Sequence, residues 1–243
     1  MLRPLAIAFG FLTRIPVPIG AAAPRELGRA VAWFPAVGAA LGALLAGAGH
    51  LLGLALAPGV AALAVVALHA AVTGGLHLDG VADVFDALGG GRGQRDRMLA
   101  ILRDSRIGAH GAVALVLVLA GKLLAIAALP AHTADWALYA APVIARWAAV
   151  PLVVGFPCVR PDGLGRAFHD HAGVAQLAGA TAIAALATGW LGARMLTPAL
   201  AAALAALAIG LWLHRRLGGL TGDVYGAAIE IAELVFLVVA GLR

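Results

Sequence analysis

Residues 30–78 read AVAWFPAVGAALGALLAGAGHLLGLALAPGVAALAVVALHAAVTGGLHL, a stretch of 49 residues without a single Asp, Glu, Lys or Arg. A helix needs about 20 apolar residues to cross a bilayer, so this stretch is long enough for two spans. Pro58 and Gly59 stand near its middle and predict the turn between them. The stretch therefore predicts a membrane protein built from several helices.

The rest of the chain has a similar composition. Of its 243 residues, 63% are hydrophobic and 12% are charged, whereas about 25% of the residues of an ordinary soluble domain are charged. Intrinsic disorder would need low hydrophobicity and high charge. A disulfide scaffold is excluded because Cys158 is the only cysteine. A polytopic membrane protein is the class that remains.

Further apolar segments bring the expected number of transmembrane helices to about seven. They cover residues 112–129, 136–156, 174–191, 197–213 and 224–242. The alternation of apolar and polar residues that is typical of an outer-membrane barrel is absent, so we predict an all-α fold. Residues 5–12 are apolar but too few for a span, and Arg14 and Pro16 follow them. We expect a short N-terminal re-entrant or interfacial segment there.

Basic residues collect on one side of this topology. If the N-terminus is cytoplasmic, segments 1–29, 79–111, 157–173 and 214–223 face the cytoplasm and hold 13 of the 17 Lys and Arg residues. The positive-inside rule favours this orientation, in a bacterial cytoplasmic (inner) membrane. The bases form no continuous tract, so we expect the lipid bilayer as a partner and no nucleic acid.

Residues 79–106 hold 10 of the 29 charged residues. On a helix, Asp79, Asp83 and Asp86 fall at i, i+4 and i+7, within about 60° of one another. Three carboxylates on one stripe repel one another unless a cation neutralises them, and hard oxygen ligands favour Mg²⁺. The alternative is a solvated helix end whose acids pair with the arginines of the next segment.

The residues that follow these acids combine glycine with arginine. Gly89-Gly90-Gly91-Arg92-Gly93 precedes a segment that contains Arg103 and Arg106. Glycine lets the backbone approach a ligand closely, and guanidinium groups bind phosphate oxygens in a bidentate manner. The segment predicts a phosphate-binding loop, although no Walker-type spacing is present. Contact of the arginines with anionic lipid headgroups is the alternative.

A second acidic set lies near the C-terminus. Asp223, Glu230 and Glu233 share one helical face. A carboxylate inside a span costs about 2.5 to 3.5 kcal/mol on insertion scales, which marks such residues as functional candidates. Lys122 and Arg146 are intramembrane bases that could neutralise these acids in a structural network. In a combined interpretation, both bases face the same cavity and bind an anionic substrate.

The histidines differ in their surroundings. His50 and His69 stand alone in apolar segments and are predicted to be packing residues. His77 precedes Asp79 by two residues, so we expect it near the acidic site. Residues 169–171, His-Asp-His, are predicted to lie in a solvated loop.

Several short motifs occur along the chain in a fixed order. They are FLTRIPVP at 11–18, GLHLDG at 75–80 with Asp83 and Asp86, RDSRIG at 103–108, Arg160-Pro161, and LTGD at 220–223 with Glu230 and Glu233. In this order and spacing the sequence resembles the cobalamin synthase family, the integral-membrane adenosylcobinamide-GDP ribazoletransferases. The resemblance extends over nearly the whole chain and implies a single membrane-embedded catalytic domain, residues 1–243.

The resemblance implies a Mg²⁺-dependent transfer late in cobalamin assembly. A hydroxyl of α-ribazole, or of its 5′-phosphate, attacks the β-phosphorus of adenosylcobinamide-GDP and releases GMP. The residues expected to bind the metal are Asp79, Asp83, Asp86 and Asp223. Those expected to act in catalysis are Asp83, Glu230 and Glu233. Those expected to bind substrate are His77, Arg103, Arg106, Lys122 and Arg146. Association with other enzymes of the pathway, or with further copies of the chain, is left open.

Other classes remain as alternatives. Asp79-Gly80 is similar to the opening of the CDP-alcohol phosphotransferase motif, but the expected arginine and the later G-x-x-x-D-x-x-x-D are missing. Aspartate-rich prenyltransferases are a weaker alternative. A transporter would explain the intramembrane charges as an ion pathway, but no inverted repeat is visible. A transporter also gives no reason for acids and arginines to collect on one side.

Overall fold

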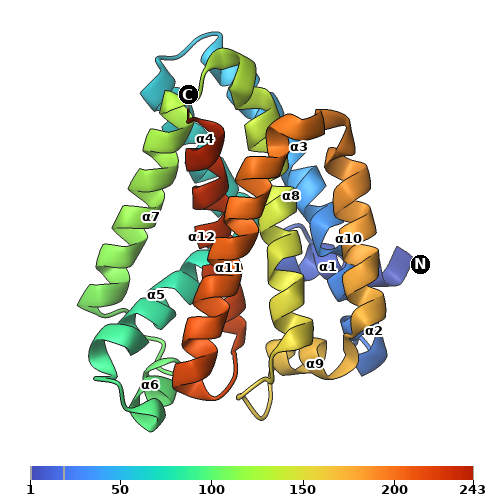
Figure 1. The fold of residues 1–243 in the computed structure, drawn as a ribbon, viewed down its shortest axis with the longest axis vertical. Helices are drawn as coiled ribbons and strands as arrows, with labels where there is room; N and C mark the ends of the chain where they lie inside the picture. The colour runs from blue at the N-terminus through green and yellow to red at the C-terminus, as the bar shows by residue number, and fades with distance from the viewer. Residues whose placement is uncertain (1, 19, 243) are drawn as a thin grey trace.

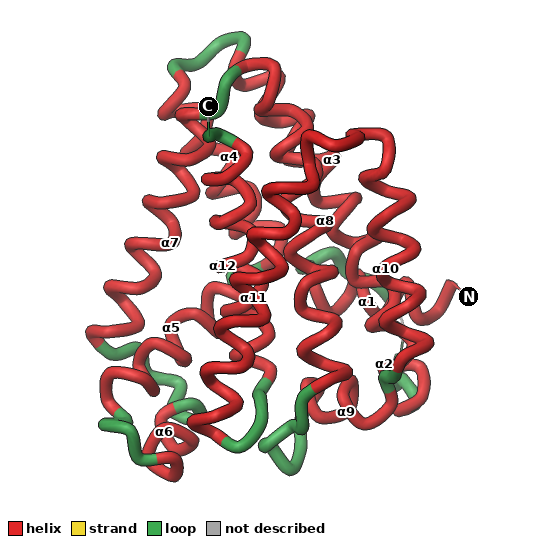
Figure 2. Tube along the Cα trace, in the orientation of Figure 1, coloured by secondary structure: helices red, strands yellow, loops and turns green. Residues whose placement is uncertain are grey.

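The computed structural model describes residues 2–18 and 20–242 as a bundle of helices (Figures 1 and 2). Apart from one backbone bridge between Cys158 and Leu220, these residues form no β-structure, which confirms the all-α prediction. In chain order the helices are α1 (Leu2–Leu12), α2 (Pro24–Ala30), η1 (Val31–Trp33), α3 (Phe34–Gly53), α4 (Pro58–Thr73), α5 (Leu76–Gly90), α6 (Arg95–Ile101), α7 (Ala109–Ala128), α8 (Ala131–Gly155), α9 (Leu164–His171), α10 (Val174–Thr188), η2 (Gly189–Met195), α11 (Leu196–Leu217) and α12 (Gly222–Ala240).

Long apolar helices make up most of the bundle. Four stretches of the described residues are long and apolar enough to cross a membrane: Pro24–Gly53, Ala109–Ala128, Ala131–Gly155 and Val174–Leu217. Helices α4 and α5 together give a fifth, which is bent by 92°. These helices confirm a polytopic membrane protein, while the number of seven spans stays a prediction.

The stretch Val174–Leu217 holds two of the predicted spans. As one straight helix its 44 residues would be about 66 Å long, roughly twice the hydrocarbon thickness of a bilayer. The helix is broken at Gly192, whose φ of 67° lies in the left-handed region. Figure 1 shows the chain reversing there, between α10 and α11. Each of the two predicted segments therefore has its own helix.

The bend between α4 and α5 decides where the acidic helix begins. Gly74 and Gly75 have φ values of 64° and 68°, a region in which a residue with a Cβ is strained. Two such residues in succession end α4 at Thr73 and start α5 at Leu76 in a new direction. The apolar stretch 30–78 therefore does not end in a straight span, because its last residues already belong to α5.

Close helix packing fixes the centre of the bundle. A Cβ at Gly38 or Gly42 of α3 would collide with the carbonyl groups of Pro142 or Tyr139 of α8. This spacing of small residues is typical of membrane helices whose backbones approach closely. Helix α12 packs against α5, α8 and α11. The last helix of the chain is therefore held next to the acidic helix α5.

The outer helices carry apolar side chains on their free surfaces. Val116 and Leu117 of α7 are 65% and 66% exposed, and Leu200 of α11 is 61% exposed. In a bilayer these side chains face lipid. Figure 1 places α6, α9 and the loops 157–163 and 218–221 together at one end of the molecule, opposite the C-terminus. The charged loops thus gather at one end, as the charge pattern predicts.

Candidate active site

Helices α5 and α12 cross with their backbones in contact. A Cβ at Gly80 would lie 2.5 Å from the carbonyl oxygen of Asp223, and a Cβ at Gly226 would lie 3.2 Å from the Cα of His77. Side chains larger than hydrogen at these two positions would force the helices apart. The crossing therefore holds the start of α12 against the first half of α5, where the predicted carboxylates lie.

Two cavities at this crossing share an acidic wall. Asp79 and Asp83 of α5, together with Ser105, line both of them. The larger cavity, about 850 Å³, also reaches residues 13–17, which follow α1. The smaller, about 550 Å³, is completed by charged residues of two loops and of α12: Arg103, Asp104, Arg160, Asp162 and Asp223. The structure thus brings Asp79, Asp83 and Asp223 to one place.

Asp79 and Asp83 are the carboxylates of this wall that are free to bind a cation. Neither forms an ion pair with a base within residues 2–18 and 20–242. The same residues contain no group of three or more His, Cys, Asp or Glu arranged to hold a metal ion. Mg²⁺, however, usually takes one or two carboxylates and completes its shell with water and substrate phosphates. The donor set fits that mode of binding.

Asp223 is held by its neighbours at the start of α12. Arg160 Nη2 lies 2.7 Å from Asp223 Oδ2, and Thr221 Oγ1 donates a hydrogen bond to the same oxygen at 3.1 Å. Thr221 Oγ1 also accepts the backbone N–H of Val224 at 3.4 Å, as an N-cap residue does. The LTGD motif therefore both starts α12 and orients a carboxylate toward the cavity.

Asp86 is turned away from the other two aspartates of α5. Its Oδ2 accepts the backbone N–H of Gly108 at 2.6 Å, and its Oδ1 accepts that of Gly111 at 2.8 Å. These groups lie at the start of α7, where unpaired N–H donors attract a negative charge. A Cβ at either glycine would collide with the carboxylate. Asp86 therefore anchors α7, and its predicted role as a metal ligand stays a prediction.

The two arginines predicted to bind phosphate lie in different surroundings. Arg103 lines the smaller cavity. The Arg106 side chain is 87% exposed and pairs with Asp104 of its own loop, with Nη2 and Oδ2 2.7 Å apart. Hydrogen bonds from the Arg106 side chain and backbone lower the pKa of Asp104 to about 2. The structure supports Arg103 as a substrate-binding residue and places Arg106 in solvent.

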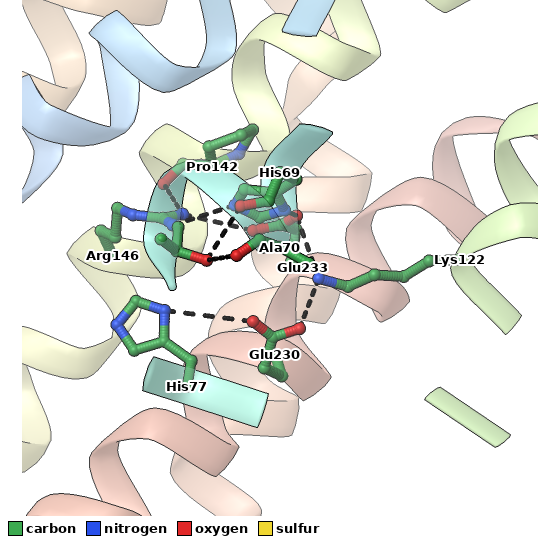
Figure 3. A network of polar contacts seen from close by, with 9 residues as sticks. His69, Ala70, His77, Lys122, Pro142, Arg146, Glu230 and Glu233 are labelled. Carbon is green, nitrogen blue, oxygen red and sulfur yellow. Dashed lines mark hydrogen bonds and ion pairs between the residues drawn. The ribbon is translucent and has the colours of Figure 1, made fainter. Parts of the chain in front are cut away.

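The intramembrane charges form one buried network (Figure 3). Lys122 Nζ lies 2.6 Å from Glu230 Oε2 and 3.1 Å from Glu233 Oε1. Arg146 Nη1 lies 3.2 Å from Glu233 Oε2. All four residues are at most 3% exposed, and none of them lines the two cavities at the helix crossing. Two bases and two acids neutralise one another inside the bundle.

This network bears on several predicted roles. Glu230, Glu233, Lys122 and Arg146 line neither of the two large cavities, so the catalytic and substrate-binding roles expected of them stay predictions. His69 joins the network, with Nδ1 3.1 Å from Glu233 Oε1. The interpretation of His69 as a packing residue missed this contact, since one histidine in an apolar segment gives no sign of a distant partner.

His77 lies between the network and the site. It is 3% exposed, and its Nδ1 is 4.0 Å from Glu230 Oε1, which is too long for a hydrogen bond. It also lines a third, smaller cavity of about 190 Å³ that includes Asp79 and Asp223. Of the predicted substrate-binding residues, His77 and Arg103 therefore lie close enough to the carboxylates to serve that role.

Two further arginines at the site were not predicted. Arg160 reaches Asp223 from the loop before α9, and Arg14 lines the larger cavity next to Gly74. The backbone N–H of Arg14 donates to the carbonyl oxygen of Val72 at 2.7 Å, which fixes the segment after α1 to the end of α4. Arg14 belongs to the motif at 11–18, and Arg160 belongs to the motif at 160–161. Their place in these motifs is the only feature of the sequence that points to a functional role for them.

Comparison with known proteins agrees with this arrangement. A family model described as cobalamin-5-phosphate synthase matches residues 4–241. A relative from Geotalea daltonii, named adenosylcobinamide-GDP ribazoletransferase, is 46% identical over 240 residues, which cover 98% of this chain and 96% of the relative. Relatives of the same name from Thiobacillus denitrificans and Pseudomonas syringae pv. syringae are 42% and 43% identical. The first alignment covers 99% of this chain and 96% of the relative, and the second 98% and 99%.

No solved structure is significantly similar to this chain. The family model and the relatives nevertheless cover nearly every described residue, including both helices that cross at the acidic wall. The chain therefore belongs to the cobalamin-5-phosphate synthase family.

Proposed function

We propose that this chain transfers the adenosylcobinamide phosphate group of adenosylcobinamide-GDP to α-ribazole or to its 5′-phosphate, with release of GMP. The observation that carries the proposal is the pair Asp79 and Asp83, which forms no ion pair within the described residues and lines two adjoining cavities. The relatives' shared name supplies the substrates. Two adjoining cavities of about 850 and 550 Å³ offer space for the large donor and for the ribose end of the acceptor.

The residues of the wall suit transfer from a diphosphate. The acceptor hydroxyl forms a new bond to the β-phosphorus, and the bond between that phosphorus and the oxygen bridging to GMP breaks. Arg14, Arg103 and Arg160 are placed to bind phosphate oxygens and to neutralise the charge on the leaving GMP. Asp83 is placed to accept the proton of the hydroxyl. Positioning and charge neutralisation are the main requirements of such a step.

We propose Mg²⁺ as the cofactor. Asp79 and Asp83 would hold it, with Asp223 beside them, because all three offer hard oxygen donors. When bound, the ion supplies positive charge to the transferring phosphoryl group. This assignment omits Asp86, whose oxygens are already bonded to α7.

A direct assay tests the activity. The protein in nanodiscs is incubated with adenosylcobinamide-GDP, Mg²⁺ and either α-ribazole or its 5′-phosphate, and GMP and the corrinoid product are measured. We expect GMP and product in equal amounts with at least one acceptor, and about 100-fold less of both with the Asp83→Asn variant. Absence of GMP with both acceptors, in several lipid compositions, would rule the proposal out.

We also propose that the site faces the cytoplasm from a bacterial inner membrane, because most basic residues lie at the end of the bundle that carries it. Gln94 lies at that end, and Ala55 lies in the exposed turn between α3 and α4 at the other. In a Cys158→Ala background, Gln94→Cys should react with an impermeant maleimide only after the cells are opened. Ala55→Cys should react from the periplasm. The reverse pattern would contradict this orientation.

A further inference from the structure

The third cavity, of about 190 Å³, differs from the two charged ones in its walls. Its charged lining residues are Asp79, Arg160 and Asp223. Its aromatic lining includes Phe168, which contacts Phe11 and Phe34 at ring-centroid distances of 4.7 and 5.6 Å. The cavity thus combines charged groups of the proposed site with a cluster of phenylalanine rings.

Two buried polar side chains of this cavity have no hydrogen-bond partner among residues 2–18 and 20–242. They are His77, which is 3% exposed and is unbonded at both ring nitrogens, and Tyr225, which is 7% exposed and is unbonded at its hydroxyl. Buried polar groups normally have partners, because an unsatisfied one costs free energy. Both side chains line the same cavity. They are therefore two free polar groups next to an apolar space.

We infer that this cavity binds the benzimidazole-type base of the ribazole acceptor, an inference that rests on the proposed function. A flat bicyclic base offers two apolar faces to the phenylalanine rings. In ribazole one ring nitrogen is bonded to the sugar and the other is a free acceptor, to which the Tyr225 hydroxyl donates a hydrogen bond, with His77 beside it. The ribose then points toward Asp79 and Asp223.

The polarity of the aromatic part of the cavity favours this base over guanine. Pockets for drug-sized ligands measure about 300–1,000 Å³, so 190 Å³ suits one bicyclic group and not a whole nucleotide. Guanine has several donors and acceptors around its edge, and His77 and Tyr225 alone cannot satisfy them all among the phenylalanine rings. A benzimidazole base has only one free acceptor. The guanine of the donor therefore belongs outside this cavity, on the charged side.

Two variants with a matched control test the inference. Ala149 of α8 lines the cavity and is 1% exposed, so Ala149→Leu fills the space that the base needs. Tyr225→Phe removes one hydrogen-bond donor and keeps the ring. Tyr139 is the only other tyrosine, and its hydroxyl donates to the carbonyl oxygen of Ala187 outside the cavity. Tyr139→Phe is therefore the control.

The first measurement is equilibrium binding of α-ribazole alone to the protein in nanodiscs, with GMP as the comparison ligand. For Tyr225→Phe we expect the Kd for α-ribazole to rise about 3- to 10-fold, the effect of one buried hydrogen bond. For Ala149→Leu we expect a rise of more than about 10-fold, because the added atoms occupy the space of the base. The Kd for GMP, and both values for Tyr139→Phe, should stay within about 2-fold.

The second measurement is steady-state turnover. Ala149→Leu and Tyr225→Phe should raise the KM for the acceptor and leave the KM for adenosylcobinamide-GDP unchanged. An equal rise for the donor, a loss of GMP binding, or unchanged α-ribazole binding in both variants would overturn the inference. If the unaltered protein binds α-ribazole but releases no GMP, the proposed function fails while the base-binding cavity stands. If Ala149→Leu does not fold, Tyr225→Phe still decides the outcome.

Discussion

Gly80 of α5 lies directly against the backbone carbonyl of Asp223 at the start of α12, so that a Cβ at position 80 would be 2.5 Å from that oxygen. No side chain separates the two helices at this point. The distance between the carboxylates of α5 and of α12 therefore depends on a backbone contact. The GLHLDG and LTGD motifs meet here, although about 140 residues separate them in the sequence.

Gly80→Ala should therefore damage the site more than the fold. The added methyl group forces α5 and α12 apart by a fraction of an ångström to an ångström, and misplacement of about 1 Å can lower a rate about 100-fold. We expect kcat to fall by about that factor while the protein still purifies as a folded monodisperse sample. Initial rates of GMP release and the thermal midpoint in detergent measure both effects.

Gly47→Ala is the matched control for that variant. Gly47 lies inside α3, and a Cβ there would meet nothing within 4 Å. Alanine has the higher helix propensity, so the thermal midpoint should stay equal or rise slightly. Equal activity of Gly80→Ala and Gly47→Ala would show that the helix contact does not position the site.

The aspartates of α5 should separate into two classes. Asp79→Asn and Asp83→Asn remove the proposed metal ligands, so we expect activity to fall by about 100-fold or more and the Mg²⁺ requirement to rise. Asp86→Asn removes a charge that accepts two backbone hydrogen bonds, each worth about 1.5–3 kcal/mol. It should lower the thermal midpoint and leave the Mg²⁺ dependence of the remaining activity unchanged.

Mg²⁺ titrations of GMP release and thermal scans in detergent distinguish the two classes. A shifted Mg²⁺ dependence in Asp86→Asn, with an unchanged thermal midpoint, would restore Asp86 to the metal site. Loss of stability without loss of Mg²⁺ affinity in Asp79→Asn would remove Asp79 from it.

Asp86 also shows where prediction from the sequence ends. The i, i+4, i+7 spacing correctly predicts that Asp79, Asp83 and Asp86 occupy one helix, because helical periodicity is local. The direction of the Asp86 carboxylate depends on N–H groups of Gly108 and Gly111, 22 and 25 residues away. Nothing in a helical pattern encodes such partners.

The apolar helices, in contrast, can be predicted because their signal in the sequence is local. Runs of apolar residues such as 112–129 and 197–213 lie inside α7 and α11 or within one residue of their ends, because length and hydropathy alone define a membrane helix. The sequence leaves open how the buried charges pair, because the intramembrane acids and bases could form either a structural network or a substrate site. Their positions in the structure show that they form a network. Arg14 and Arg160 are single bases in loops, so no periodicity marks them.

Removing one charge of a buried ion pair should lower the stability of the protein more than removing both charges. Lys122→Met leaves the Glu230 carboxylate without its partner at 2.6 Å, and an uncompensated buried charge destabilises by about 3–5 kcal/mol. Adding Glu230→Gln restores neutrality, since Arg146 still pairs with Glu233. We expect the double variant to be more stable than Lys122→Met alone, as measured by unfolding in mixed micelles.

An exposed pair provides the comparison for this experiment. Arg166 Nε and Asp170 Oδ2 are 2.7 Å apart, but their side chains are 40% and 37% exposed. Asp170→Asn should therefore leave the stability almost unchanged. If Lys122→Met were as mild as Asp170→Asn, the intramembrane charges would not be a structural network, and a role in substrate binding would have to be considered again.

Replacing Arg160 and replacing Arg106 should affect the reaction to different extents, although each arginine lies in a loop and pairs with an aspartate. Arg160 lines the wall of the smaller cavity and holds Asp223 at 2.7 Å, whereas the Arg106 side chain is 87% exposed and holds Asp104. Arg160→Gln removes a charge proposed to bind phosphate, worth about 2 to 3 kcal/mol, so GMP release should fall about 30- to 150-fold. Arg106→Gln should lower it less than about 3-fold. The measurement is the rate of GMP release at saturating Mg²⁺ with both substrates. A larger loss for Arg106→Gln than for Arg160→Gln would place the phosphate-binding group on the outer loop instead of at the carboxylate wall.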